Sequence, residues 1–202
     1  QNTLQLNDGN RGFSEIAYFS GVAASDWSWG ALMFDADNDA YTDIYVCNGI
    51  YHDVTDQDFI DFFANEMIQQ MALTGKKEEL DSVLSKMPSV KIPNKAFRNL
   101  GNLRFEDASE KWGFQTPSFS NGSAYGDLDN DGDLDLIVNN VNQPVFVYKN
   151  NADTLTTNHY IGVRLKGSEK NRFAVGAKIE LHLGNSIINR EMIPSRGFQS
   201  SI

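Results

Sequence analysis

The chain has 202 residues, 41% of them hydrophobic, and its 17 basic and 27 acidic residues give a formal net charge of −10. This length can form one or two domains with a buried core. The acidic balance, with no basic cluster to neutralise phosphates, argues against nucleic acid as a partner, and the apolar runs are too short for a membrane span. No signal peptide is visible at Gln1, as expected of a mature chain or an excised fragment.

The first predicted element is an acidic loop, Asp35–Asp43, with aspartates at every second position and one more after a gap. Aspartate is unfavourable in strands and in helices, and two carboxylates about 4 Å apart repel by about 4 kcal/mol at an effective dielectric constant of 20. A hard cation with oxygen ligands removes this repulsion, and Ca²⁺ is the usual one. The spacing predicts a calcium site whose ligands are Asp35, Asp37, Asp39, the carbonyl oxygen of Tyr41, and Asp43.

Two details refine this site. Ala40 occupies the sixth loop position, where a sharp turn favours glycine, so a positive φ there would cost energy and leave the site weaker or differently shaped. An EF-hand would carry a glutamate at the twelfth position, which is Val46 here, and the loop leads into the apolar run Ile44–Cys47. We therefore expect a loop–strand calcium site, with an acidic turn without metal as the alternative. Cys47, the single cysteine, is expected to be a buried hydrophobe and not a reactive thiol.

A helical insert is predicted over about residues 49–93. Phe59, Phe63, Met67 and Met71 follow one another at four-residue spacing, Thr55 with Asp58 resembles a capping box, and Gly75 is a plausible stop. A second helix is predicted from Lys77 to about Lys86. We expect the apolar face to pack on the surrounding β structure, with a lipid- or partner-binding helix as the alternative.

A second acidic loop, Asp127–Asp135, has the same spacing and carries Gly132 at the turn position. It predicts a second calcium site, and it leads into the apolar run Leu136–Val138 with no glutamate at the twelfth position. The ligands of this site are predicted to be Asp127, Asp129, Asp131, the carbonyl oxygen of Asp133, and Asp135.

The two loops belong to a duplicated unit. A shift of 92 residues aligns Asn2 with Asn94, Phe13 with Phe105, and Asn48 with Asn140 without a gap. Phe97–Asn99 also resembles Tyr148–Asn150, so the underlying unit is near 50 residues long and the helical insert lengthens the first copy. Short apolar runs with Asn-Gly and Asp-Gly turns predict about four short strands per unit, which is typical of one blade of a β-propeller.

The character of the chain changes after Asn150. A polar, linker-like stretch is followed by strand-like segments at Tyr160–Leu165, Ala177–Leu183 and Ile187–Ile193, with a Gly184-Asn185 turn. These segments predict a small separate β module over residues 151–202.

At this point the chain resembles known families. The acidic loops and their flanks resemble FG-GAP repeats, also called VCBS repeats, of integrin-alpha-type propellers. Gly21–Asn48 is similar to the version in cartilage acidic protein and its bacterial relatives, while Asn171–Ala177 with Ser195–Ser200 resembles the ASPIC/UnbV domain. The resemblance implies a mainly β fold: two propeller-type calcium-binding blades in residues 1–150 with an α-helical insertion, then a partial ASPIC/UnbV-like β domain.

The resemblance also implies a function. We expect a non-catalytic, calcium-stabilised binding or adhesion module at the cell surface or outside the cell, which is a fragment of a larger bacterial protein that supplies the remaining blades. Its partner would be an extracellular protein or a glycan. Two recognisable repeats are too few to close a propeller ring.

Two alternatives stay open at this point. One is a secreted enzyme acting on polysaccharide, with His52, Asp53 and Tyr51 as candidate residues and His159–Tyr160 and His182 as weaker ones, although a surface or capping role for His52 is favoured. The other is direct glycan binding by Trp27 and Trp29, for which we favour packing in the core. The glycosylation sequon at Asn121 is expected to be incidental.

Overall fold

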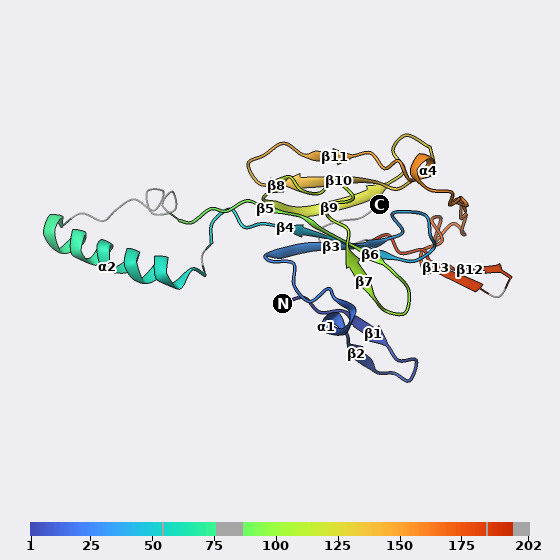
Figure 1. The fold of residues 1–202 in the computed structure, drawn as a ribbon, viewed down its shortest axis with the longest axis horizontal. Coiled ribbons are helices and arrows are strands. Elements are labelled where there is room, and N and C mark those ends of the chain that lie inside the picture. The colour runs from blue at the N-terminus through green and yellow to red at the C-terminus, as the bar shows by residue number, and fades with distance from the viewer. Residues whose placement is uncertain (54, 76–86, 185, 196–202) are drawn as a thin grey trace.

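The chain is mainly β and forms several small antiparallel sheets (Figure 1). The computed structural model describes residues 1–53, 55–75, 87–184 and 186–195. The predicted second insert helix and all of the Ser195–Ser200 motif except Ser195 lie outside these residues. Within them, the sheets do not form a closed propeller ring.

The larger of the two main sheets contains the first acidic loop. Its four strands lie in the order β3-β4-β6-β7 and are all antiparallel. The strands are β3 (Ser28–Phe34), β4 (Asp43–Asn48), β6 (Lys95–Asn99) and β7 (Phe105–Asp107). Strand β3 alternates between buried and exposed side chains, whereas every residue of β4 is buried. The acidic loop joins β3 to β4.

The second main sheet repeats this arrangement. Its strands lie in the order β11-β10-β9, and the second acidic loop joins β9 to β10 as the first joins β3 to β4. The strands are β9 (Ser120–Gly126), β10 (Asp135–Asn140) and β11 (Phe146–Tyr148). The two acidic loops therefore occupy equivalent places, each between the first and second strands of its sheet.

The main core lies between these two sheets. Leu32, Tyr45 and Cys47 from the first sheet pack with Leu136 and Val138 from the second. Each of these side chains is at most 3% exposed, so the core excludes water and stabilises the stacked sheets through apolar burial. Cys47 is fully buried, as the sequence predicts.

A short hairpin precedes the first sheet. Strands β1 (Gln5–Asn7) and β2 (Phe13–Glu15) pair with each other and are followed by helix α1 (Ala17–Ser20). The 92-residue shift places β2 on β7 and β1 within β6. Ala17 and Val22 pack against Ile44, Val46 and Phe97 in a second core cluster on the other side of β4 and β6.

The insert contains the predicted helix, α2 (Gln57–Thr74). Its N-terminal cap is Asp56, whose carboxylate accepts a hydrogen bond from the Phe59 N–H at 2.9 Å, instead of the expected Thr55. Gly75 follows the last turn with φ +66°, consistent with the predicted stop. Helix α2 projects away from both main sheets in Figure 1, so the expectation that it packs on them is wrong for the described residues.

The base of the insert is closed by backbone pairing. Strand β5 (Ile92–Pro93) pairs with β8 (Pro117–Ser118), and Ile50 forms an isolated bridge with Val90. The two ends of the insert therefore lie side by side.

The C-terminal part contains helix α4 (Ala152–Leu155) and a hairpin of β12 (Lys178–Leu183) and β13 (Ser186–Glu191). The hairpin matches the two later predicted strands, with Gly184 at φ +58° at its turn. The predicted strand at Tyr160–Leu165 is wrong, because this segment pairs with no other strand among the described residues. None of the described helices is both long and apolar enough to cross a membrane.

Candidate functional site

The first acidic loop is held in shape by its own carboxylates. Asp35 accepts hydrogen bonds from the backbone N–H groups of Asp39 and Ala40 at 3.1 and 2.9 Å. The Asp43 carboxylate accepts one from the Ala36 N–H at 2.9 Å and one from the Asn99 N–H at 2.8 Å. Asp43 thus closes the loop and ties it to strand β6.

The second loop uses the same bonds at equivalent positions. Asp135 accepts hydrogen bonds from the N–H groups of Leu128 at 2.9 Å and Asn150 at 2.8 Å. Asp127 accepts one from the Gly132 N–H at 3.2 Å. The aspartate at the ninth position of each loop, Asp43 or Asp135, therefore has a structural role in addition to its predicted role as a ligand.

The sixth position of each loop has a left-handed backbone. Ala40 has φ +73° and Gly132 has φ +93°. This conformation costs a residue with a β-carbon about 1–2 kcal/mol, so Ala40 bears the cost anticipated from the sequence.

The carboxylate oxygens gather into three groups. Asp35, Asp37 and Asp39 form one group in the first loop, and Asp127, Asp129 and Asp135 form another in the second. Asp131 and Asp133 lie instead with Asp153 of α4. Within each group, one oxygen from each residue lies within 4.8 Å of the others. The structure thus brings the first three predicted ligands together in the first loop but divides those of the second.

Electrostatics in the first loop favour a cation. Burial, and then the neighbouring Asp39 carboxylate, raise the pKa of Asp35 to about 6, and burial also raises the pKa of Asp39. The buried Oδ1 atom of Asp37 has no hydrogen-bond partner among the described residues. An unpaired, buried carboxylate oxygen beside two other carboxylates fits an oxygen-seeking cation such as Ca²⁺.

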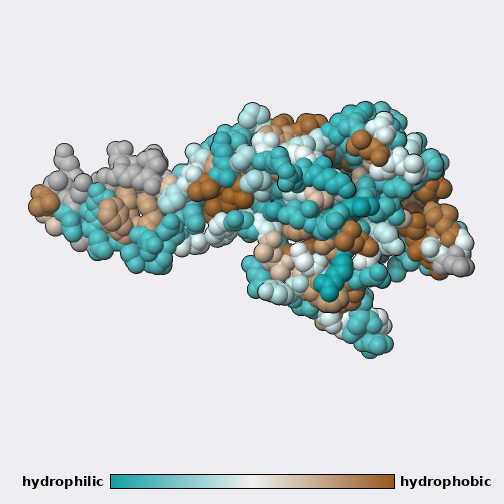
Figure 2. Space-filling model, in the orientation of Figure 1, coloured by the Kyte–Doolittle hydropathy of each residue, from teal (hydrophilic) through white to brown (hydrophobic). Residues whose placement is uncertain are grey.

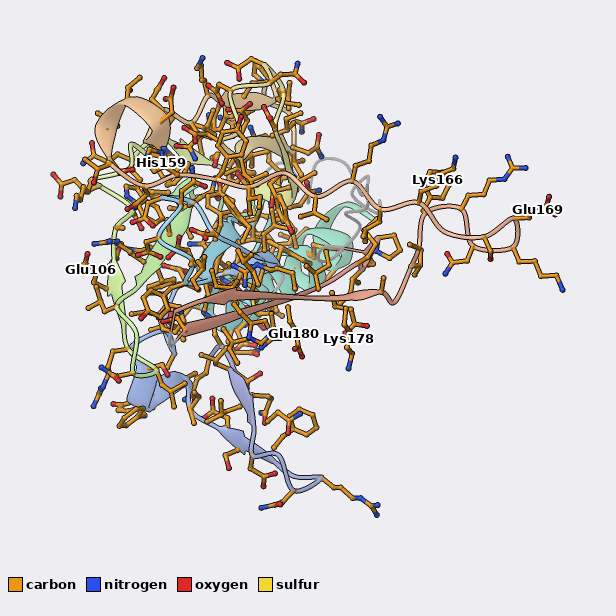
Figure 3. The ribbon with its side chains drawn as sticks, turned by 90° about the vertical axis from the view of Figure 1, so that its right-hand side faces the viewer. Glu106, His159, Lys166, Glu169, Lys178 and Glu180 are labelled. Atoms are coloured by element: carbon orange, nitrogen blue, oxygen red, sulfur yellow. The ribbon has the colours of Figure 1, made fainter. Side chains whose placement is uncertain are left out.

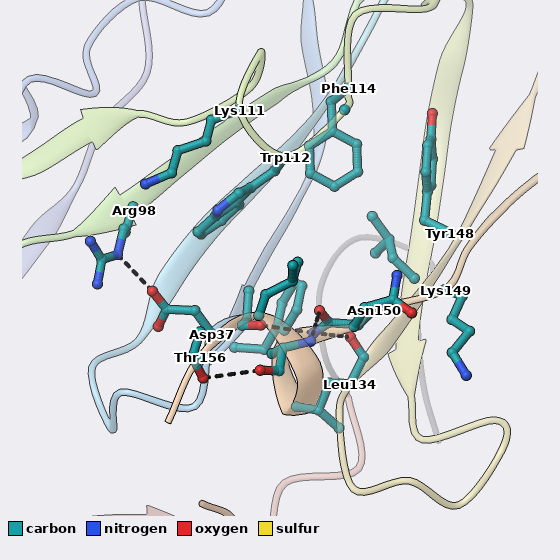
Figure 4. Close-up of a pocket in the computed structure, with 17 residues that line it drawn as sticks. Asp37, Arg98, Lys111, Trp112, Phe114, Leu134, Tyr148, Lys149, Asn150 and Thr156 are labelled. Carbon is teal, nitrogen blue, oxygen red and sulfur yellow. Dashed lines mark hydrogen bonds and ion pairs between the residues drawn. The ribbon is translucent and has the colours of Figure 1, made fainter. Parts of the chain in front are cut away.

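Each loop also has a basic partner at the third strand of its sheet, on β6 in the first sheet and directly after β11 in the second. Arg98 contacts Asp37 at 2.6 Å (Figure 4) and Asp39 at 3.2 Å. Lys149, its counterpart under the alignment of Phe97–Asn99 with Tyr148–Asn150, pairs with Asp129 and lies 3.3 Å from Asp131. In both loops the basic residue meets the third and fifth positions. The Lys149 hydrogen bond holds the pKa of Asp129 below its usual value.

The two loops contact each other directly. Asn38 donates a hydrogen bond to the fully buried Asp133 at 2.7 Å, and Asn150 donates one to the Ala36 carbonyl at 2.7 Å. Asp133 also accepts the Asp153 N–H at 2.6 Å. Sequence reasoning assigned only the Asp133 carbonyl and missed the role of its carboxylate, since the partner residues are far apart in the chain.

Residues from the C-terminal part complete the surroundings of the loops. Asn158 donates to the Asp37 carbonyl at 2.9 Å, and Arg190 of β13 lies 3.7 Å from Asp35 and donates to the Ala40 carbonyl at 3.3 Å. The sequence offered one usable signal for the basic partners, namely that Arg98 and Lys149 align in the repeat. It offered none for Asn158 or Arg190.

The candidate catalytic residues do not converge. His52 lies at the base of the insert, where its ring contacts Tyr51, and its buried Nδ1 has no partner among the described residues. His159 lies in the segment after α4 (Figure 3), and His182 lies 3.5 Å from Glu180 with its side chain 63% exposed. The described residues therefore bring no two of these histidines into one site.

The two tryptophans before the first loop differ in exposure. Trp27 is half-buried, whereas Trp29 is 48% exposed and donates its indole N–H to the Gly49 carbonyl. The expectation of core packing is therefore wrong for Trp29.

The C-terminal hairpin presents apolar side chains at the end of the molecule that carries β12 and β13 (Figure 2). Leu183 and Ile187 are both more than half exposed.

Residues 167–202 match the family model described as ASPIC and UnbV. The predicted resemblance to ASPIC/UnbV is thereby confirmed for residues 167–202. A search of curated proteins returns no match for the chain.

Proposed function

We propose that this chain is a calcium-stabilised, non-catalytic binding module of a larger bacterial protein that acts at the cell surface or outside the cell. The observation that carries the proposal is the Asp35–Asp37–Asp39 cluster, whose carboxylates converge around an unpaired, buried oxygen. Asp35, Asp37 and Asp39 would hold the ion in the first loop, with Asp127, Asp129 and Asp135 in the second. The ion would supply positive charge that orders the loops.

The equivalent placement of the loops supports FG-GAP-type blades. Each acidic loop joins the first two strands of its sheet, and the two sheets pack face to face. Ile137 and Val147, which pair on β10 and β11, are both exposed. An apolar pair on the outer face of a sheet is suited to packing against another blade. Because β1 and β2 align with β6 and β7, we also assign this hairpin to the outer half of a preceding blade.

Thermal unfolding with added calcium tests the metal. At free calcium about a hundredfold above the dissociation constant, one site adds about 2.7 kcal/mol. We expect the melting temperature to rise by several degrees relative to chelator, and the rise to shrink in Asp37→Asn and Asp129→Asn. The matched control is Glu110→Gln, an exposed acid outside the loops. An equal melting temperature with calcium and with chelator would refute the proposal.

Glycan binding is the second candidate, and the exposure of Trp29 favours it. A tryptophan that is 48% exposed can stack its indole ring on a sugar ring. We expect Trp29→Ala to abolish binding on a polysaccharide panel if this function holds, while Trp27→Ala reduces stability instead. Turnover on the same panel that is lost in His52→Ala would favour the enzyme alternative.

A further inference from the structure

A cavity of about 560 Å³ opens between the two main sheets, next to the acidic loops (Figure 4). Its walls come from the end of β3, the turn at residues 111–114, strands β10 and β11, and helix α4. Small-molecule sites commonly have volumes of about 300–1,000 Å³, and a cavity of about 150 Å³ already admits benzene. The space is therefore sufficient for an aromatic ring with a side group.

Aromatic and aliphatic side chains form most of the cavity surface. In Figure 4, Trp112 and Phe114 lie on one side and Tyr148 on the other, with Leu134 below them in this view. Phe114 and Tyr148 meet edge to face, with ring centroids 4.9 Å apart. Trp112, Phe114 and Tyr148 are all only half-buried. They leave apolar surface that an aromatic ligand can cover.

The charged residues at the cavity are mainly basic although the protein is acidic. Three cations, Arg98, Lys111 and Lys149, face one carboxylate, Asp37. Arg98 is paired with Asp37, and Lys149 pairs with Asp129 and Asp131 outside the cavity lining. Lys111 has no ion-pair partner among the described residues. It therefore offers a free positive charge beside the Trp112 ring.

Few hydrogen-bond donors and acceptors of the cavity lining are left free for a ligand. Asn150 donates to the carbonyls of Ala36 and Leu134, and Thr156 donates its hydroxyl to the Ala152 carbonyl. A sugar, which needs many hydrogen-bond partners, would leave its hydroxyls unsatisfied here. A ligand with an apolar ring and one anionic group matches the lining better.

We propose that this cavity binds a small aromatic carboxylate. The ring would lie against Trp112 and the contacting pair of Phe114 and Tyr148, and the carboxylate would pair with the Lys111 ammonium group. Burial of the ring supplies most of the affinity, and the charge-assisted hydrogen bond to Lys111 selects the acid over uncharged analogues.

Isothermal titration calorimetry on the full chain tests this site with two probes, indole-3-acetate and its uncharged analogue indole-3-acetamide. We expect the acid to bind at least tenfold more tightly than the amide. Lys111→Met should lower the affinity for the acid to that for the amide, because Lys111 is exposed and its substitution leaves the core intact. Lys166→Met is the matched control, since Lys166 lies on a segment that extends away from the main body (Figure 3) and should change neither affinity.

A second variant probes the ring contact. Phe114→Ala should weaken acid and amide equally, with thermal unfolding used to verify that the variant is folded. The titrations are run with calcium and with chelator. Acid binding that is equal in both conditions supports the Lys111 site. The proposal is overturned if neither probe binds, if Lys111→Met leaves the preference for the acid unchanged, or if acid binding requires calcium, which would put the carboxylate on the metal.

Discussion

The ring of Tyr160 lies directly over the α-carbon of Gly132. A β-carbon built on Gly132 would come within 1.9 Å of Tyr160 Cε1, far inside van der Waals contact. Two features therefore disfavour a side chain at Gly132, namely its φ of +93° and the Tyr160 ring above it. Ala40, the equivalent residue of the first loop, has the same kind of backbone and contacts Arg190 through its carbonyl.

This contact predicts an unequal response to alanine. Gly132→Ala should destabilise the fold by about 2–3 kcal/mol, of which about 1–2 kcal/mol comes from the positive φ and the remainder from displacing Tyr160. Gly113→Ala is the matched control, because Gly113 has φ +83° but open space around its α-carbon. Chemical denaturation measures both. If Tyr160→Ala fails to reduce the difference between the two glycine variants, the ring contact is not its cause.

Asp43 should stabilise the fold even without metal. Its side chain is buried, and its two oxygens accept the N–H groups of Ala36 and Asn99. Asp43→Ala leaves both donors unsatisfied, so we expect a loss of about 2–4 kcal/mol in chelator. Asp129→Ala removes a carboxylate that is 40% exposed and should cost much less under the same conditions. Equal losses in urea denaturation would contradict this division of roles.

Arg98 should weaken calcium binding, because its positive charge already neutralises part of the negative charge of the Asp37 and Asp39 carboxylates. Arg98→Met removes a positive charge a few ångströms from the proposed ion, and we expect calcium affinity at the first loop to rise about tenfold. Lys149→Met should act similarly at the second loop. Lys95→Met, on the same strand as Arg98 but paired with Asp107, is the control. Calorimetry that gives unchanged or weaker calcium binding in Arg98→Met would count against the ion's placement.

Cys47 predicts a specific pH dependence. Burial raises the pKa of its thiol to about 11, whereas an unfolded thiol ionises near pH 8.5. The folded state keeps the thiol neutral, so this contribution is complete below about pH 8.5 and is lost as pH rises toward 11. Between pH 8 and pH 10 the native chain should lose about 2 kcal/mol more than Cys47→Ala. Iodoacetamide should label Cys47 only after denaturation, and rapid labelling of the native chain would contradict its burial.

The insert should be removable without loss of the sheets. The Asp53 N–H donates to the Pro88 carbonyl at 3.2 Å, so the ends of residues 54–87 already meet. Replacing these residues with Gly-Gly shortens a long loop and lowers its closure entropy cost by about 2.5 kcal/mol. We expect the melting temperature to fall by less than about 3 °C. Deleting residues 49–93 should instead destabilise the fold strongly, because that deletion also removes β5 from its pairing with β8. Similar outcomes for the two deletions would mean that the insert itself supports the core.

Features set by short stretches of sequence could be predicted. The alternation of aspartates locates both acidic loops, the gap-free shift of 92 residues anticipates their equivalent places in two sheets, and the run Ile44–Cys47 is a buried strand. Helix α2 and the turn at Gly184 follow from spacing and backbone preference. These features depend on residues a few positions apart, whose geometry is limited by backbone sterics and by strand and helix periods.

Only the tertiary structure decided how distant residues meet. Asn38 reaches Asp133 across 95 positions and Asn150 reaches Ala36 across 114, and Asp153 joins Asp131 and Asp133 although it lies outside the repeated motif. The cavity beside Lys111 likewise depends on the way two sheets and α4 come together. Such contacts depend on the stacking and twist of whole sheets, which no local spacing encodes. The sequence by itself therefore determined where the acidic loops occur, and the stacked sheets decided which charges surround them.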